Sequence, residues 1–362
     1  MCGKGYKMAK DLNQLLRDVV QEGASDLHLG VDTVPHMRLD GGLVPIDSAV
    51  MNAASVKSLV YSILTDEQKD KFEKDKELDF AFTISGLSRF RVNVFFQRGC
   101  VGAAIRALPF KIMSFEECGL PINVVQDFCN RQKGLVLVTG ATGSGKSTSL
   151  ASMIDYINIH RDCHIITIED PIEYVHSNKK SIVDQREVGS DTHTFARALK
   201  HVLREDPDVI LIGEMRDLET VEAALVIAET GHLVFATLHT SDSSQTINRI
   251  IDVFPSRQQA QVRTQLSFVL TGVLSQQLLP RKSGKGRVLA VEILIANHAM
   301  KSLIRESKIH QVYSVIQTGQ KDNMQTMNQA LFELYKKGDI SEKEALASTT
   351  EVQDLERMLR GK

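Results

Sequence analysis

The stretch GATGSGKST, residues 140–148, restricts the folds open to this chain more than any other feature. It matches the pattern G-x-x-x-x-G-K-[ST], follows the apolar run LVLV and precedes the helix-forming segment KSTSLASMIDYI. Glycines let successive backbone N–H groups turn toward phosphate oxygens, and the start of a helix adds a positive dipole end there. We therefore predict an α/β domain with a phosphate-binding loop between a strand and a helix.

The nine residues of this loop are the expected nucleotide-binding residues. They are Gly140, Ala141, Thr142, Gly143, Ser144, Gly145, Lys146, Ser147 and Thr148. In loops of this kind the lysine reaches the β- and γ-phosphates and the next hydroxyl binds Mg²⁺. We expect ATP and Mg²⁺ as ligands, with Lys146 and Ser147 in those two roles.

Four apolar runs belong to the same part of the chain: LVLVTG, HIITIED, DVILIGE and HLVFATLHT. Continuous apolar strands separated by helical segments are typical of a parallel sheet covered on both faces. Ligands bind outside the carboxyl ends of such strands. Glu214, which ends the third run, is therefore our first choice for the catalytic base and a candidate Mg²⁺ ligand. A helix-capping role or a simple ion pair with Arg216 is the alternative.

Three acids follow the second strand, at Glu169, Asp170 and Glu173. Carboxylates so close together repel one another unless a cation or protonation relieves them. Mg²⁺ at a nucleotide site would supply the cation. We expect Asp170 to bind the metal and keep Glu169 and Glu173 as further catalytic candidates. A solvated acidic loop is the alternative.

Two histidines, His232 and His239, bracket the fourth strand. About seven residues of strand span roughly 23 Å, so the two imidazoles cannot share a metal ion. His239 stands at the carboxyl end with Thr237 and is better placed to contact the γ-phosphate. Both histidines are catalytic candidates, and a capping or structural role is the alternative for His232.

The first hundred residues predict a small α+β domain. Residues 11–20, DLNQLLRDVV, have apolar residues at helical spacing. In residues 88–99, SRFRVNVFFQRG, strand alternation places Arg89 and Arg91 on the face opposite Phe90 and Val92, and Arg106 follows on the next strand. These arginines either face water or contribute charge to a catalytic site, and the pattern alone leaves both open.

Residues 108–121, LPFKIMSFEECGLP, predict a linker because proline and glycine occur with little periodicity. We place the boundary near Phe110, which gives domains of residues 1–110 and 111–362. Each is long enough to bury a core of its own.

Composition and charge argue against several other classes of protein. A net charge of -2 gives no basic excess, so no specific nucleic-acid partner is expected. The five cysteines form no CxxC pair, which argues against a disulfide scaffold and a zinc ribbon. No apolar run approaches the roughly 18 residues of a membrane span, and no signal-peptide pattern opens the sequence. We therefore expect a cytoplasmic protein.

Several motifs together resemble the PilT family of type IV pilus retraction ATPases, a branch of the secretion-type ATPases. They are GASDLHL, RFRVN, GLVLVTGATGSGKST, TIEDPIEYVH, QREVG, LREDPDVILIGEMRDLET and ETGHLVFATLHT. The resemblance implies a PAS-like N-terminal domain and a RecA-like P-loop domain with a mainly parallel sheet and C-terminal helices. It also implies a cytoplasmic homohexamer at the inner membrane, at the pilus base, that hydrolyses ATP to power pilus retraction and twitching motility.

The resemblance also gives the arginines a task. In this family, arginines of the N-terminal domain reach the nucleotide of a neighbouring RecA-like domain, and Arg89, Arg91 and Arg106 are the matching candidates. An arginine supplied to a phosphoryl-transfer site is worth about 10³ to 10⁵ in rate. The implied partners are an inner-membrane platform protein of the pilus and other pilus motor ATPases.

Two features of the sequence bear on whether the chain is a retraction motor, an assembly motor or an accessory paralogue. The segment AMKSLIRE, residues 299–306, stands where the family typically reads AIRNLIRE, so an accessory PilT-like paralogue is an alternative to the principal retraction motor. The long N-terminal region and zinc insert of pilus assembly ATPases are not found, which favours retraction. A nucleic-acid translocase is a weaker alternative, because the chain has no tryptophan and 6% aromatic residues.

Overall fold

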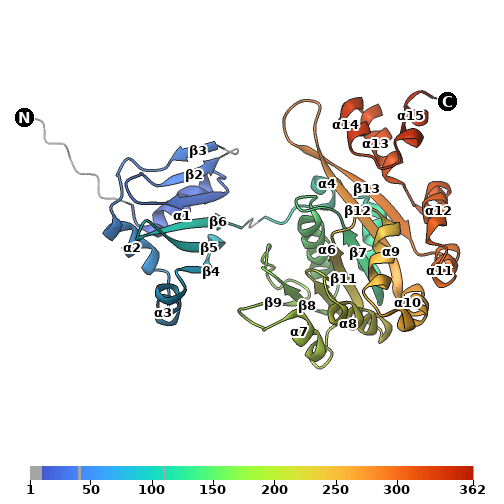
Figure 1. Ribbon diagram of the computed structural model, residues 1–362, viewed down its shortest axis with the longest axis horizontal. Coiled ribbons are helices and arrows are strands. Elements are labelled where there is room, and N and C mark those ends of the chain that lie inside the picture. The colour runs from blue at the N-terminus through green and yellow to red at the C-terminus, as the bar shows by residue number, and fades with distance from the viewer. Residues whose placement is uncertain (1–9, 40–41, 109–110, 362) are drawn as a thin grey trace, which may run out of the picture. The chain divides into compact units, whose positions relative to one another are not determined.

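A computed structural model describes residues 10–39, 42–108 and 111–361, and Figure 1 shows its elements. The chain divides into an N-terminal unit, residues 1–111, and a C-terminal unit, residues 112–362. Phe110, where the sequence places the domain boundary, lies outside the described residues.

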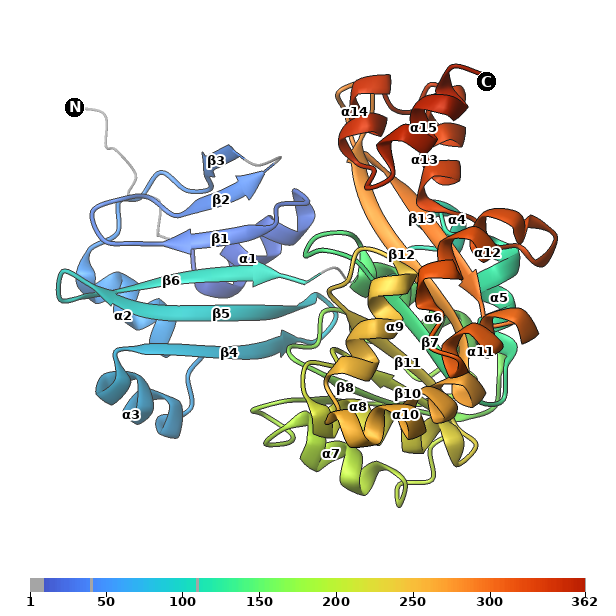
Figure 2. The same ribbon diagram turned by 45° about the vertical axis from the view of Figure 1, so that its right-hand side comes forward.

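The N-terminal unit is a six-stranded antiparallel sheet in the order β3-β2-β1-β6-β5-β4, with helices packed on one face (Figure 2). Its elements are α1 (Leu12–Gln21), β1 (Asp26–Leu29), β2 (His36–Leu39), β3 (Gly42–Pro45), α2 (Ala53–Tyr61), α3 (Asp66–Asp75), β4 (Glu77–Ile84), β5 (Ser88–Gln97) and β6 (Cys100–Ala107). The helices bury the sheet face that carries Leu27, Val92 and Ile105.

Helix α1 begins where the sequence predicts it, because Asp11 and Gln14 form a capping box. The Asp11 carboxylate accepts a hydrogen bond from the Gln14 backbone N–H, and the Gln14 side chain accepts one from the Asp11 N–H. The apolar residues at helical spacing are all buried: Leu12, Leu15, Leu16 and Val19.

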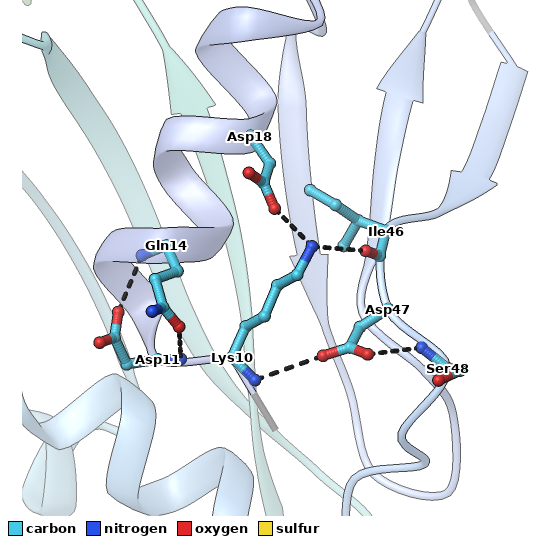
Figure 3. A network of polar contacts seen from close by, with 7 residues as sticks. All are labelled: Lys10, Asp11, Gln14, Asp18, Ile46, Asp47 and Ser48. Atoms are coloured by element: carbon cyan, nitrogen blue, oxygen red, sulfur yellow. Dashed lines mark hydrogen bonds and ion pairs between the residues drawn. The ribbon is translucent and has the colours of Figure 1, made fainter. Parts of the chain in front are cut away.

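Lys10 fastens the start of α1 to the segment that follows β3 (Figure 3). Its ammonium group lies 2.6 Å from the Asp18 carboxylate and also donates a hydrogen bond to the Ile46 carbonyl. Its backbone N–H donates to the Asp47 carboxylate. Polar contacts therefore hold the beginning of the helix, while apolar packing holds its buried face.

Strand β5 shows the predicted alternation, with Phe90 and Val92 buried and Arg91 exposed. Arg91 is paired directly with Arg106 of β6, and Arg106 with Asp26 of β1. Because directly paired residues share a face, a row of three charged side chains crosses the sheet on the face opposite the helices.

The C-terminal unit is built on a seven-stranded sheet in the order β13-β12-β7-β11-β10-β8-β9. Every neighbouring pair is parallel except β12 and β13. The strands are β7 (Gly134–Thr139), β8 (His164–Glu169), β9 (Ile182–Glu187), β10 (Val209–Ile212), β11 (Leu233–Leu238), β12 (Leu270–Pro280) and β13 (Arg287–Ile295). The four predicted apolar runs form β7, β8, β10 and β11, which confirms the mainly parallel sheet.

Helices cover both faces of this sheet, as its apolar strands require. One face packs against α4 (Phe115–Cys118), α5 (Ile122–Asn130) and α6 (Lys146–His160). The other packs against a layer formed by α7 (Phe195–Val202), α8 (Leu218–Glu229), α9 (Ser243–Asp252), α10 (Ser256–Val269), α11 (His298–Arg305) and α12 (Val312–Thr318). The last described helices, α13 (Met327–Lys336), α14 (Glu342–Ala347) and α15 (Val352–Leu359), pack beside the β12–β13 hairpin.

None of the helices in the described part of the chain combines the length and the apolar character needed to cross a bilayer.

Two regions depart from the sequence-based predictions. The predicted linker contains helix α4, which starts at a capping box formed by Ser114 and Glu117. Four residues are too short to show a helical period. Strands β9, β12 and β13 also have no clear signal, because polar residues such as Gln185 and Gln276 interrupt their apolar runs.

Candidate active site

The phosphate loop connects β7 to α6, in the structural context that the motif requires. Gly140 has a φ of 140° and Gly145 a φ of 91°, a region of backbone conformation that glycine tolerates best. Gly140 also has no room for a side chain, because an added Cβ would lie 2.4 Å from the Gln276 carbonyl oxygen. The loop thus turns tightly beside β12 and exposes the amino end of α6, a favourable site for an anion.

The Lys146 ammonium group lies inside this loop, and the residue as a whole is 9% exposed. It donates hydrogen bonds to the carbonyl oxygens of Gly140 at 2.7 Å and Ala141 at 3.0 Å. Burial lowers the pKa of Lys146, and the Glu214 carboxylate opposes that change. The buried Ser144 hydroxyl has no hydrogen-bond partner within the described residues. Both groups are donors that suit phosphate oxygens.

Glu214 lies just beyond β10 and contacts an arginine and a histidine side chain. Arg216 Nη2 is 2.7 Å from one carboxylate oxygen and His239 Nε2 is 3.2 Å from the other. Burial works against ionisation, but Arg216 and His239 together lower the pKa of Glu214 below its ordinary value. The ion pair with Arg216 is therefore present, and it leaves Glu214 as a permanent anion at the edge of the site.

Glu169 ends β8 and is held by two neutral donors. Thr167 Oγ1 donates a hydrogen bond to Glu169 Oε1 at 2.7 Å, and Gln185 Nε2 donates to the same oxygen at 3.2 Å. Burial raises the pKa of Glu169 to about 7, although both hydrogen bonds oppose the rise. Glu169 and Glu214 thus differ in their environments. Glu169 is desolvated and held by neutral donors, whereas Glu214 is paired with the Arg216 guanidinium.

The remaining acids lie on the loop after β8, residues 170–176. Asp170 is exposed and Glu173 is half-buried. Tyr174 on the same loop shares a hydrogen bond with the Thr148 hydroxyl at 2.9 Å. The acid-bearing loop is therefore attached to the first turn of α6, next to the phosphate loop.

The two histidines lie at opposite ends of β11. His239 contacts Glu214 at the carboxyl end, as the sequence predicts. His232 precedes the amino end, where its Nδ1 lies 3.1 Å from the Ile227 carbonyl oxygen and from the Thr230 hydroxyl. The structure does not bring His232 to the phosphate loop of the same chain, and its catalytic role stays a prediction beside the structural alternative.

Arg89, Arg91 and Arg106 lie on one face of the N-terminal sheet, two on β5 and one on β6. Arg106 donates a hydrogen bond through Nε to Asp26 at 2.8 Å, while 62% of its side chain is exposed. Asp26 is buried, which would raise its pKa, but hydrogen bonds from Ser25 and Arg106 lower it overall. A pairing through Nε leaves the two Nη groups of Arg106 for another acceptor.

A cavity of about 430 Å³ unites the site within the C-terminal unit. The predicted residues that line it are Thr142, Gly143, Gly145, Lys146, Ser147, Thr148, Glu169, Asp170, Glu173, Glu214 and His239. Three strand ends and the phosphate loop thus contribute to one hollow, as expected for the carboxyl edge of a parallel sheet.

Three further residues that line the cavity were not predicted as site residues. Tyr174 and His176 belong to the loop after β8, and Arg287 begins β13. The first two lie in the motif TIEDPIEYVH, directly after the acids, and this is the signal that could have found them. Arg287 reaches the cavity through the pairing of β12 with β13, which no local pattern reveals.

Comparisons with known proteins agree with this site. The chain matches the family described as type II/IV secretion system protein over residues 4–347. It is 50% identical to the type IV pilus retractation ATPase PilT of Pseudomonas aeruginosa, across 92% of this chain and 97% of that protein. It is 40% identical to the type IV pilus ATPase PilU of the same species, across 97% of this chain and 91% of that protein.

The structure is also similar to a crystal structure of the pilus retraction motor PilT with bound ADP. The TM-score is 0.90 at 52% identity, and the match covers 96% of this chain and all of that chain. The predicted architecture, a small N-terminal domain followed by a RecA-like ATPase domain, is thereby confirmed. The chain belongs to the type II/IV secretion system protein family, and within it to the PilT group of pilus retraction ATPases.

Proposed function

We propose that this protein is a hexameric motor that hydrolyses ATP to drive retraction of type IV pili, and thereby twitching motility. The observation that carries the proposal is the single cavity in which Lys146, Glu169 and Glu214 meet beside the phosphate loop. The 50% identity to a pilus retraction ATPase supports the pilus as the object of the work.

In this proposal the two acids divide the chemistry. Glu169, held by neutral donors, accepts the proton of the attacking water as general base. Glu214, held by Arg216 and His239, remains an anion that orders water and cation. This differs from the sequence-based preference for Glu214 as the base, because a carboxylate paired with an arginine is the weaker base.

The residues present fit a Mg²⁺ ion that arrives with ATP. Ser147, Asp170 and Glu214 line one cavity and offer the hydroxyl and carboxylate oxygens that Mg²⁺ prefers. Within the described ranges, no group of three His, Cys, Asp or Glu could hold a metal by itself, which agrees with an ion held largely by phosphate and water. When bound, Mg²⁺ would neutralise charge on the β- and γ-phosphates.

The arginines of the N-terminal unit complete the site of a neighbouring subunit in this proposal. Arg91 and Arg106 lie opposite each other, and Arg106 is largely exposed although it pairs with Asp26. Arg89 is the third candidate, on the same strand as Arg91. An arginine supplied in this way is worth about 10³ to 10⁵ in rate, so hydrolysis would depend on ring assembly. Closing and opening of each interface would then move one subunit against the next.

The ring would act on the cytoplasmic side of the inner membrane at the pilus base, docked on a platform protein. Other pilus ATPases would be further partners. An accessory role beside a principal retraction motor is the second candidate, and the 40% identity to PilU favours keeping it.

A Lys146→Ala variant tests the proposed function. Loss of the ammonium group should abolish ATP hydrolysis by the purified protein and pilus retraction in the cell. Glu214→Gln removes the anion that orders water and cation, so it should still bind ATP but turn it over about 100-fold more slowly. Unchanged hydrolysis in Lys146→Ala would contradict the site, whereas lost hydrolysis with normal retraction would favour the accessory role.

A further inference from the structure

Gln185 lies on the edge strand β9, outside the cavity lining, yet its amide contacts the site at three points. Its carbonyl oxygen accepts a hydrogen bond from the His176 backbone N–H at 2.7 Å. Its amide nitrogen donates to the Tyr174 carbonyl oxygen at 2.8 Å and to Glu169 Oε1 at 3.2 Å. One side chain thus holds both the Glu169 carboxyl group and the backbone of the loop that follows it.

The loop of residues 170–176 depends on β9 for its shape. Besides the two contacts of Gln185, the Ile172 backbone N–H donates a hydrogen bond to Glu187 Oε2 at 3.1 Å. Glu187 therefore supports the same loop, and it is also the register partner of Glu169 where β9 pairs with β8. Two side chains of β9 thus hold the backbone of this loop.

The loop is fixed on its other side by α6. Tyr174 shares a hydrogen bond with Thr148 through its hydroxyl group, and its carbonyl oxygen accepts the bond from Gln185. A continuous set of hydrogen bonds therefore runs from the phosphate loop helix through Tyr174 and Gln185 to Glu169. Such a set can fix the distance between a catalytic carboxyl group and a phosphate held by the loop.

We propose that Gln185 is a positioning residue for ATP hydrolysis, which holds the Glu169 carboxyl group in the orientation that activates water. Gln185 and Thr167 together donate both hydrogen bonds that Oε1 receives from side chains. The inference rests on the proposed function, because the orientation of Glu169 matters only if the site cleaves ATP. Loss of an orienting partner with the nucleotide still bound should reduce turnover more than affinity.

Two substitutions of Gln185 separate its contacts. Gln185→Glu keeps an acceptor for the His176 N–H but removes the donor and places a second carboxylate beside Glu169. Gln185→Met keeps the approximate volume and removes every hydrogen bond. We expect kcat to fall about 10- to 100-fold in both variants, while KM for ATP changes less than about 3-fold. Gln277→Met, on β12 outside the cavity lining, is the matched control and should behave as wild type.

A double-mutant cycle with Glu169→Gln distinguishes positioning from general support. If Gln185 acts through Glu169, Gln185→Met should reduce kcat little further in the Glu169→Gln background. Independent losses for Gln185→Met, or wild-type kcat in both Gln185 variants, would overturn the inference. Absence of ATP hydrolysis in the wild-type protein would instead contradict the proposed function.

Discussion

His176 is a buried histidine at the wall of the active-site cavity, with 8% of its surface exposed. Burial lowers its pKa to about 4, a change that Asp155 opposes and Lys179 reinforces. Its Nδ1 atom has no hydrogen-bond partner within the described residues. The imidazole is therefore neutral in the folded protein over the physiological pH range and gains a proton far more readily after unfolding.

This difference predicts a loss of stability in acid. Above about pH 6.5 the imidazole is neutral in both states, but between about 6.5 and about 4 only the unfolded chain binds the proton. The free energy of unfolding should therefore fall with pH across this window, by up to about 1.4 kcal/mol per pH unit from this group. His176→Gln removes the contribution and should show a shallower pH dependence in urea denaturation followed by circular dichroism.

The control is His310→Gln, an exposed histidine in the short 3₁₀ turn of residues 309–311. This variant should keep the wild-type pH dependence, because the His310 side chain is exposed and the substitution leaves His176 in place. Parallel stability curves for wild type and His176→Gln between about pH 7 and about pH 4.5 would show that His176 is not held neutral by the fold.

At the level of single residues, sequence reasoning identified the residues that stand at fixed positions in local motifs. Lys146 and Glu214 stand at fixed positions in motifs, and each lies in the cavity. Gln185 stands in the motif QREVG, but the motif did not indicate its role, because that role depends on the pairing of β8 with β9. His232 also stands in a motif, and it lies at the end of β11 away from the cavity, so its catalytic role stays a prediction.

In the C-terminal unit, helix α5 packs tightly against strand β12 of the sheet. Gly272 of β12 packs against Phe128 of α5, and a Cβ added to it would lie 2.2 Å from Phe128 Cζ and 2.8 Å from the Leu294 carbonyl oxygen. Phe128 is fully buried, so it cannot move aside without displacing α5 from the sheet. Gly272→Ala should therefore lower the free energy of unfolding by about 1–3 kcal/mol, measured by urea denaturation.

A matched substitution with room for the new methyl group tests this explanation. A Cβ on Gly30, which also has ordinary backbone angles, would meet Thr33 Cγ2 at 3.4 Å and Gln97 Nε2 at 3.7 Å, which are ordinary contacts. Gly30→Ala should change stability by less than about 1 kcal/mol. Equal losses in the two variants would mean that the cost comes from the backbone and not from the contact with Phe128.

Helices and strands were likewise predicted where their signal is local, and they were missed where the signal depends on residues far away in the sequence. Strands β7, β8, β10 and β11 are continuous apolar runs and were predicted correctly. Strand β12 is nearly as buried, but Ser275 and Gln276 lie within it because they hydrogen-bond to Thr139 and Ser149 beside the phosphate loop. These polar residues are buried and hydrogen-bonded to distant partners, but in the sequence they only interrupt an apolar run. The sequence therefore does not show that β12 is a core strand. Helix α4 was missed because a single turn has no period.

At the scale of the whole molecule, the charged groups that we propose for phosphoryl transfer are divided between two compact units. The C-terminal unit carries the phosphate loop and the acids, and the N-terminal unit carries the paired Arg91 and Arg106. If the proposed ring is correct, neither unit of one subunit completes a site alone. ATP hydrolysis should then require an interface between two subunits, and the ATPase activity per subunit should rise with protein concentration.

Mixing two inactive variants tests this division directly. Lys146→Ala removes the phosphate-binding ammonium group but keeps the arginines, whereas Arg106→Gln keeps the phosphate loop and still offers Asp26 a hydrogen-bond donor. Each variant alone should lose most ATPase activity. In mixed rings, a Lys146→Ala subunit can supply its arginine to an Arg106→Gln neighbour, so random mixing should restore about a quarter of the interfaces.

The control partner is the double variant Lys146→Ala/Arg106→Gln, which has no arginine to supply and should restore nothing when mixed with Arg106→Gln. Two affinity tags, purified in sequence before the assay, establish that every measured particle contains both variants. Recovery only with the single variant Lys146→Ala means that the arginine acts on a neighbouring subunit. Rings that contain both variants yet stay inactive would place Arg106 and Lys146 in one and the same subunit's site, and hydrolysis would then no longer require movement between subunits.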